Sequence, residues 1–191
     1  RRIERSAVRR LRWLVAETEF ARSWALGHNP QAHVALIPHA VRRAFLEQSK
    51  PTGSKRVISV GGPDTRKAMD TVVRAFSMVG DPEASLCIVG GGSGLHALRQ
   101  LASEPGLSGR TELPGVLDTE AVIRELTRSG IFVIASRMDT SPNVVSEAHA
   151  IGLPVIGTRA GGIPEMIEDE VDGFVVDVDD HVAMAEKIKL L

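Results

Sequence analysis

The residues best equipped for chemistry lie in one short stretch, residues 136–147, which follows an apolar run ending at residue 135. Pro142 is typical of a first helical position and Ser141 of an N-cap, so we expect a helix to begin here. The backbone amides of Asn143 and Val144 would then lack partners within the helix and would lie at its positive dipole end. Because such an end binds phosphate and other anions, this segment predicts an anion site.

Two carboxylates flank the predicted anion site. Asp139 lies on the loop before the helix, and Glu147 shares a helix face with Asn143 because the two are four residues apart. The helix would hold Glu147 rigidly near the mouth of the ligand-binding cleft. The competing interpretation is an ordinary helix cap followed by a surface glutamate, and this segment alone leaves both open.

Two further loops offer groups to an anion. Gly161 and Gly162 precede a proline and allow close approach of the backbone to a ligand. Gly61 and Gly62 follow another apolar run, and we expect Lys67 in the first turn of the next helix. If these loops leave the same edge of one sheet, the ammonium group lies near the same cleft. A local turn and a surface lysine are the alternatives.

That common edge follows from the alternation of strands and helices after residue 55. Apolar, mostly β-branched runs predict strands, and a segment with helical periodicity follows each of them. The predicted strands are residues 56–60, 86–89, 111–113, 131–134, 154–156 and 173–176. Continuous apolar strands between helices indicate an α/β fold with a doubly wound parallel sheet, in which ligands bind outside the carboxyl ends of the strands.

The composition excludes several other classes of function. The chain has 191 residues, a formal net charge of −1 and one cysteine, Cys87. It therefore has no disulfide framework and no overall attraction for nucleic acid. The glycine run at residues 90–94 lacks the G-x-G-x-x-G spacing of a dinucleotide fold, because residue 95 is leucine, and we interpret it as a tight turn.

The first 44 residues follow a different pattern. Residues 1–13 hold six arginines and one glutamate, a local charge of +5. We expect a helix there with Val8, Leu11, Leu14 and Val15 on one face. A solvated helix face and contact with an anionic membrane surface are both open. We expect that this chain is part of a longer protein and was cut at both ends.

Together, the motifs resemble those of the family 4 retaining glycosyltransferases, the group 1 family. The resemblance rests on Asp139 and Glu147 with seven residues between them, on residues 148–158, and on the Gly-Gly-Ile-Pro-Glu loop at residues 161–165. It implies a GT-B fold, with two Rossmann-like domains and the active site between them. Residues 45–191 would be the C-terminal, donor-binding domain, truncated at its C-terminus. Residues 1–44 would be a remnant of the N-terminal acceptor domain and the crossing segment.

The resemblance also implies a role for individual residues. Glu147 would bind the ribose hydroxyls of a nucleotide-sugar donor, and Asp139 would meet the donor sugar; these two are the implied catalytic residues. Lys67 and the amides around Asn143 and Val144 would hold the diphosphate. The other implied donor-binding residues are Gly61, Gly62, Arg66, Gly115, Val116, Ser141, Gly161 and Gly162.

Three positions depart from the family pattern. Gly62 stands where the family usually has arginine, and Arg66 or Arg137 is the candidate replacement. Ala68 follows the lysine where the family has glycine. Asp139 is one methylene shorter than the family's glutamate.

The implied activity is transfer of a sugar from a UDP, GDP or ADP sugar to a hydroxyl of a carbohydrate or lipid-linked acceptor, with retention and without a metal or other cofactor. Cations and amides would stabilise the leaving diphosphate, and Asp139 an oxocarbenium-like state. The resemblance also implies a cytoplasmic location, in solution or at the inner face of the membrane, with peripheral membrane contact through the N-terminal domain. A nucleotide-sugar-binding module without turnover, a GT-B-type nucleotide-sugar epimerase and an NAD-dependent dehydrogenase are the alternatives.

Overall fold

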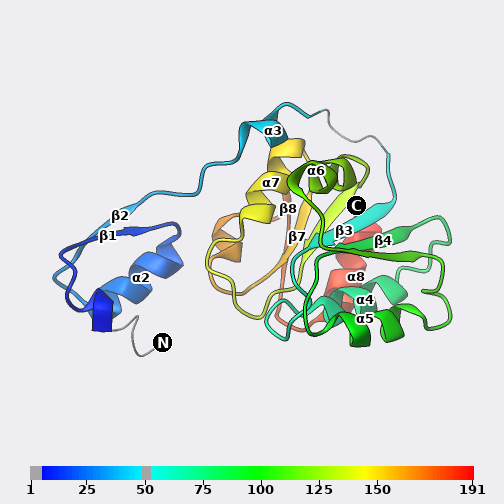
Figure 1. The fold of residues 1–191 in the computed structure, drawn as a ribbon, viewed down its shortest axis with the longest axis horizontal. Helices are drawn as coiled ribbons and strands as arrows, with labels where there is room; N and C mark the ends of the chain where they lie inside the picture. The colour runs from blue at the N-terminus through cyan, green and yellow to red at the C-terminus, as the bar shows by residue number, and fades with distance from the viewer. Residues whose placement is uncertain (1–5, 49–52) are drawn as a thin grey trace.

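The computed structural model describes residues 6–48 and 53–191, which contain two parallel sheets (Figure 1). The larger sheet has six strands in the order β5-β4-β3-β6-β7-β8. These strands are β3 (Arg56–Val60), β4 (Ser85–Val89), β5 (Thr111–Gly115), β6 (Ile131–Ile134), β7 (Val155–Thr158) and β8 (Gly173–Val176). Every neighbouring pair is parallel, so all six carboxyl ends lie at one edge. From β3 the chain adds β4 and β5 on one side, and it then returns to add β6, β7 and β8 on the other side of β3. This strand order confirms the predicted doubly wound α/β fold.

Helices cover both faces of this sheet because its strands are apolar on both sides. One face carries α4 (Met69–Ser77), α5 (Leu95–Ala102) and α8 (His181–Leu190), with Phe76 and Leu86 fully buried between helix and sheet. The other carries α6 (Thr119–Thr127), α7 (Asn143–Ile151) and the short α3 (Arg43–Leu46), with Phe45 and Phe132 fully buried. Within the described ranges, no helix is both long and apolar enough to cross a membrane.

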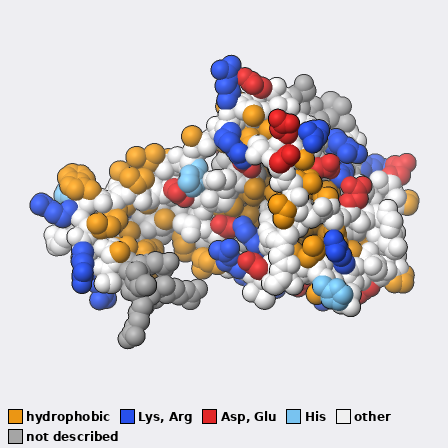
Figure 2. Space-filling view, in the orientation of Figure 1, with side chains coloured by type: hydrophobic (Ala, Val, Ile, Leu, Met, Phe, Trp, Pro, Cys, Tyr) orange, Lys and Arg blue, Asp and Glu red, His pale blue; other side chains and the backbone are white. Residues whose placement is uncertain are grey.

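A smaller unit precedes the sheet domain. Strand β1 (Trp13–Ala16) pairs in parallel with β2 (His33–Leu36), and α2 (Glu19–His28) connects them. Thr18 caps α2, since its hydroxyl accepts a hydrogen bond from the amide of Ala21 at 3.2 Å. Apolar side chains gather on the surface of this unit, including Trp13, which is 75% exposed (Figure 2).

The predicted helix at the N-terminus is confirmed for residues 6–8 and wrong from residue 13 onward. Residues 6–8 are helical, residues 9 and 10 form a turn, and residues 1–5 lie outside the described residues. Leu14 and Val15 belong to β1 instead of a helix face, and they pair with Val34 and Ala35 of β2. Pairing with a strand 20 residues away overrides the local helical periodicity.

The two units touch through specific polar contacts. The hydroxyl of Thr18 donates to the carbonyl oxygen of Thr140 at 3.2 Å. The carboxylate of Glu165 accepts hydrogen bonds from the amides of Glu19 at 2.5 Å and Phe20 at 2.7 Å. Glu165 therefore accepts hydrogen bonds from the free amides at the N-terminus of α2. It does not play this part for the short 3-10 helix η1 (Ile163–Glu165), to which it belongs.

Candidate functional site

Three predicted loops meet at the carboxyl edge of the sheet. They follow β3, β6 and β7, which are neighbours in the sheet. The amide of Arg137, after β6, donates to the carbonyl oxygen of Arg66, after β3, at 2.7 Å. The amide of Gly162, after β7, donates to the carbonyl oxygen of Asp139 at 2.9 Å. The structure thus assembles the candidate residues of these loops into one place, as the parallel topology predicted.

An ion pair joins the first two loops. The Nζ atom of Lys67 lies 2.5 Å from Oδ2 of Asp139, and both side chains are only 17% exposed. The carboxylate of Asp64 orders the turn that carries the lysine, because it accepts hydrogen bonds from the amides of Arg66 and Lys67 at 3.0 and 2.8 Å. Lys67 lies in a turn before α4, which begins at Met69, and not in the first helical turn as predicted. Its partner holds it at this edge of the sheet, so it is not a freely solvated surface lysine.

The glycine pair after β7 fixes the loop that carries Asp139. Gly161 has a φ of +58°, and a Cβ atom there would lie 1.8 Å from the carbonyl oxygen of Asp139. A Cβ atom at Gly162 would lie 2.0 Å from the carbonyl oxygen of Thr140 and 2.6 Å from Cγ2 of Thr18. Both glycines are thus required for backbone packing against the neighbouring loop. Whether they also approach an anion remains a prediction.

The glycine run after β4 packs against the loop after β3. A Cβ atom at Gly90 would lie 2.1 Å from the carbonyl oxygen of Gly61, and one at Gly94 would lie 2.3 Å from that of Pro63. Gly62 lies beside this contact, because a Cβ atom there would be 3.1 Å from the carbonyl oxygen of Gly91. Close approach between loops explains this run without a dinucleotide.

The start of α7 differs from the prediction in its capping residue. The helix begins at Asn143, and its N-cap is Pro142, in an extended conformation with ψ of 110°. Ser141 is therefore not the cap, and no side chain caps this helix. The ring of Pro142 precedes the helix instead of forming its first residue. The amides of Asn143 and Val144 precede the first helical hydrogen bond, from Val145 to the carbonyl oxygen of Pro142, so they are free of helical partners.

Glu147 is buried, which contradicts the interpretation of a surface glutamate. Its residue is 8% exposed, and its Oε1 atom lies 3.1 Å from Nη2 of Arg42. Together with Asn143 and Ser146, which share its helix face, it lines a cavity of about 190 Å³. Residues 39–42 of the segment between β2 and α3 form the other wall.

Arg42 is the site residue that the sequence did not reveal. Its Nη1 atom also donates to Oγ1 of Thr119 at 2.9 Å, and its guanidinium lies 5.4 Å from the ring centroid of Phe45. A single arginine in an irregular segment carries no motif, so no local signal could have identified it.

The loop after β5 lies on the far side of β4 and β3. Gly115 has a φ of +81°, and its carbonyl oxygen accepts a hydrogen bond from the amide of Gly90 at 2.8 Å. Val116 is 79% exposed, and a Cβ atom at Gly91 would lie 2.7 Å from its Cγ2 atom. An exposed apolar side chain beside a glycine loop offers a surface against which a planar aromatic ring of a ligand can stack.

Arg66 and Arg137, the candidate replacements for the arginine that the family has at the position of Gly62, bind other partners. Arg66 is largely exposed and lies 3.8 Å from the carboxylate of Asp64. Arg137 lies 2.7 Å from the carboxylate of Asp179, a contact that raises the pKa of this guanidinium. Its Nη1 atom donates to the carbonyl oxygen of Thr65 at 2.5 Å. Arg137 is therefore engaged away from the Lys67–Asp139 pair.

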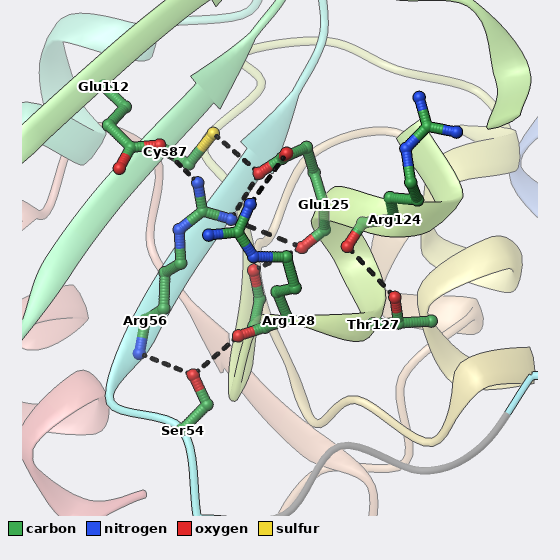
Figure 3. Close-up of polar contacts among 9 residues, drawn as sticks. Ser54, Arg56, Cys87, Glu112, Arg124, Glu125, Thr127 and Arg128 are labelled. Atoms are coloured by element: carbon green, nitrogen blue, oxygen red, sulfur yellow. Dashed lines mark hydrogen bonds and ion pairs between the residues drawn. The ribbon is translucent and has the colours of Figure 1, made fainter. Parts of the chain in front are cut away.

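A second polar cluster lies near the amino ends of the strands, away from this edge (Figure 3). Arg56, the first residue of β3, contacts Glu112 and Glu125 at 2.5 Å each. Burial raises the pKa of the neighbouring Cys87 thiol to about 11, so the thiol is protonated at neutral pH. The two carboxylates and the thiol lie close enough to hold a cation together. The guanidinium already occupies that position, so we assign the cluster a structural role.

Comparisons with known proteins agree with this arrangement. A family model described as Glycosyl transferases group 1 matches residues 41–191. The lipopolysaccharide core biosynthesis glycosyltransferase LpsE of Rhizobium meliloti is 31% identical over 150 residues, which cover 78% of this chain and 42% of that protein. The chain spans less than half the length of the curated relatives it matches.

Solved structures share the fold over nearly the whole chain. Sucrose-phosphate synthase from Thermosynechococcus elongatus superposes with a TM-score of 0.87 at 22% identity, covering 99% of this chain and 51% of that one. Anabaena Alr3699/HepE in complex with UDP also gives a TM-score of 0.87, at 17% identity, covering 99% of this chain and 56% of that one. The expected relation to two-domain proteins of this architecture is thereby confirmed at the level of fold.

Proposed function

This chain belongs to the group 1 glycosyltransferase family, and on that basis we propose that it binds a nucleoside-diphosphate sugar at the carboxyl edge of the six-stranded sheet. The protein transfers the sugar to a hydroxyl acceptor with retention. In this proposal residues 45–191 hold the donor, and residues 1–44 belong to the acceptor domain and the crossing segment.

The burial of Glu147 beside the uncapped start of α7 supports the proposal most strongly. A buried carboxylate costs free energy unless hydrogen-bond donors or a cation satisfy it. Arg42 contacts Oε1, and the cavity of about 190 Å³ lies against the same side chain. Vicinal hydroxyls of a ribose are donors of the right kind for the remaining acceptor capacity.

The diphosphate has two sources of positive charge at this edge. The amides of Asn143 and Val144 lie at the positive end of α7, one helical turn before Glu147. Lys67 supplies an ammonium from the neighbouring loop. Its present partner is Asp139, so donor binding gives the lysine a second anion and places the Asp139 carboxylate close to the sugar.

The proposed chemistry needs no metal or other cofactor. The leaving group is a nucleoside diphosphate, and the amides and Lys67 stabilise the charge that develops on it. Asp139 stabilises the oxocarbenium-like transition state on the sugar side. The proposed base is uracil, guanine or adenine, stacked near Gly115 and Val116.

The proposed acceptor is a carbohydrate or a lipid-linked hydroxyl, and the proposed location is the cytoplasm or the inner face of the membrane. The name of the Rhizobium meliloti relative, a lipopolysaccharide core biosynthesis glycosyltransferase, supports a role in cell-envelope polysaccharide synthesis.

Calorimetric titration with UDP, GDP, ADP and NAD tests the donor site directly. We expect one nucleoside diphosphate to bind, and Glu147→Ala to weaken it by about ten- to a hundredfold, because charge-assisted hydrogen bonds contribute roughly 1.5–3 kcal/mol. Glu186→Ala is the matched control, since this glutamate is exposed on α8. Binding of NAD alone, or unchanged affinity in a folded Glu147→Ala protein, would contradict the proposal.

Turnover is tested separately from binding. Transfer of sugar is measured with this chain and with a longer protein that includes the complete acceptor domain. Transfer only by the longer protein would fit the proposal. Donor binding without transfer in both would instead favour the alternative of a binding module.

A further inference from the structure

The side chain of Arg42 connects two elements that border the candidate donor site. Its Nη2 atom contacts Oε1 of Glu147 on α7 at 3.1 Å, and its Nη1 atom donates to Oγ1 of Thr119, the first residue of α6, at 2.9 Å. Arg42 itself lies just before α3, in the segment that joins the smaller unit to the sheet domain. One guanidinium therefore ties that segment to both helices.

The guanidinium is held in one orientation by its surroundings. Its central carbon lies 5.4 Å from the ring centroid of Phe45, which is fully buried between α3 and the sheet domain. A planar group that rests on an aromatic ring and donates through two nitrogens loses most of its rotational freedom. Its contact with Glu147 is thereby fixed in direction.

Arg42 and Glu147 differ in how far solvent can replace their ion pair. The side chain of Arg42 is 61% exposed, so water can solvate it without Glu147. The side chain of Glu147 is only 10% exposed. Among the described residues, Arg42 is the only cation paired with this carboxylate, and Oε2 receives no hydrogen bond. Removing the arginine therefore leaves a buried charge without its cation.

We infer that Arg42 is a positioning residue of the donor site, an inference that rests on the proposed function. It holds Oε1 of Glu147 and leaves Oε2 directed to the ligand's ribose hydroxyls. Because Arg42 belongs to the connecting segment, the orientation of the ribose-binding carboxylate depends on where that segment lies against α6 and α7.

A double-mutant cycle on this chain tests the inference. UDP, GDP and ADP are titrated calorimetrically, and the tightest of them is then compared with its 2′-deoxy analogue. The proteins are the wild type, Arg42→Ala, Glu147→Ala and the double variant. Arg43→Ala is the matched control, because the side chain of this neighbour is exposed and, among the described residues, forms its one ion pair with Glu47.

We expect Arg42→Ala to weaken binding of the diphosphate by about three- to tenfold, which lies within the lower part of the range for directly coupled neighbours. The same substitution should have almost no effect in the Glu147→Ala background. It should also reduce the discrimination between the nucleotide and its 2′-deoxy analogue, which a general loss of stability does not change. Arg43→Ala should bind like the wild type. Arg42→Lys, with one donor group in place of a fork, should lie between the wild type and Arg42→Ala.

Equal losses from Arg42→Ala in both backgrounds would overturn the inference, because Arg42 would then act without Glu147. Normal binding by a folded Arg42→Ala protein, while Glu147→Ala binds weakly, would overturn it as well. If Glu147→Ala binds like the wild type, the proposed function fails first and the inference fails with it. Should Arg42→Ala not fold, Arg42→Lys and Arg42→Gln complete the cycle.

Discussion

Replacing Gly161 with alanine should destabilise the protein far more than its exposure suggests. Alanine at a φ of +58° costs about 1–2 kcal/mol because its Cβ atom meets the adjacent carbonyl oxygen. The new Cβ atom would also lie 1.8 Å from the carbonyl oxygen of Asp139, so one loop must move by more than about 1 Å. Such overpacking adds roughly 1–3 kcal/mol. The movement would also disturb the hydrogen bond from Gly162 to Asp139, which contributes about 1 kcal/mol.

Urea unfolding of a matched pair of variants separates these contributions. Gly80 has a φ of +75°, and a Cβ atom added there would meet no other atom within 4 Å, so Gly80→Ala carries the conformational cost without the clash. We expect Gly161→Ala to lose about 2–4 kcal/mol more than Gly80→Ala in the free energy of unfolding, the sum of the overpacking and the disturbed hydrogen bond. Equal losses in the two variants would refute the close approach between the loops after β6 and β7.

Two residues at the same edge of the sheet and one in its core allow further tests. Asp139→Asn removes the anion that competes for Lys67, so nucleoside diphosphate affinity should not fall, but turnover of the longer protein should fall by about a hundredfold; near-normal turnover would remove the catalytic assignment. Lys67→Ala should weaken diphosphate binding more than nucleoside binding, by a margin that shrinks as salt is added, whereas equal losses would mean a purely structural lysine. Burial raises the pKa of the Cys87 thiol to about 11, so between about pH 9 and pH 11 the unfolded chain loses a proton that the folded chain keeps. The free energy of unfolding should therefore fall as pH rises through this window, and urea unfolding of Cys87→Ala should show a smaller fall.

The sheet could be predicted from the sequence because its signals are local. The bounds of β3, β6 and β8 agree with the predicted ranges, since each is an apolar run closed by glycine or polar residues. The strand at Trp13–Ala16 could not be predicted in the same way. Its conformation depends on a partner strand, and its own apolar spacing also fits a helix.

The candidate site was predictable only where topology brings loops together. Because parallel strands share one edge, the topology predicts Lys67, Asp139 and the glycine pair at that edge, and the structure joins them by an ion pair and a backbone hydrogen bond. The burial of Glu147 and its contact with Arg42 depend on how the connecting segment packs against α7. No spacing within the sequence encodes that packing.

The contact of Glu165 with α2 also gives the molecule a built-in reporter. Amides in the first turn of a helix have no helical partner and ordinarily exchange their protons with solvent rapidly. Those of Glu19 and Phe20 donate to a carboxylate of the other unit, at 2.5 and 2.7 Å. Their protection from hydrogen–deuterium exchange therefore lasts only while the two units are in contact. Two backbone positions, without any attached label, thus report whether the two units stay in contact.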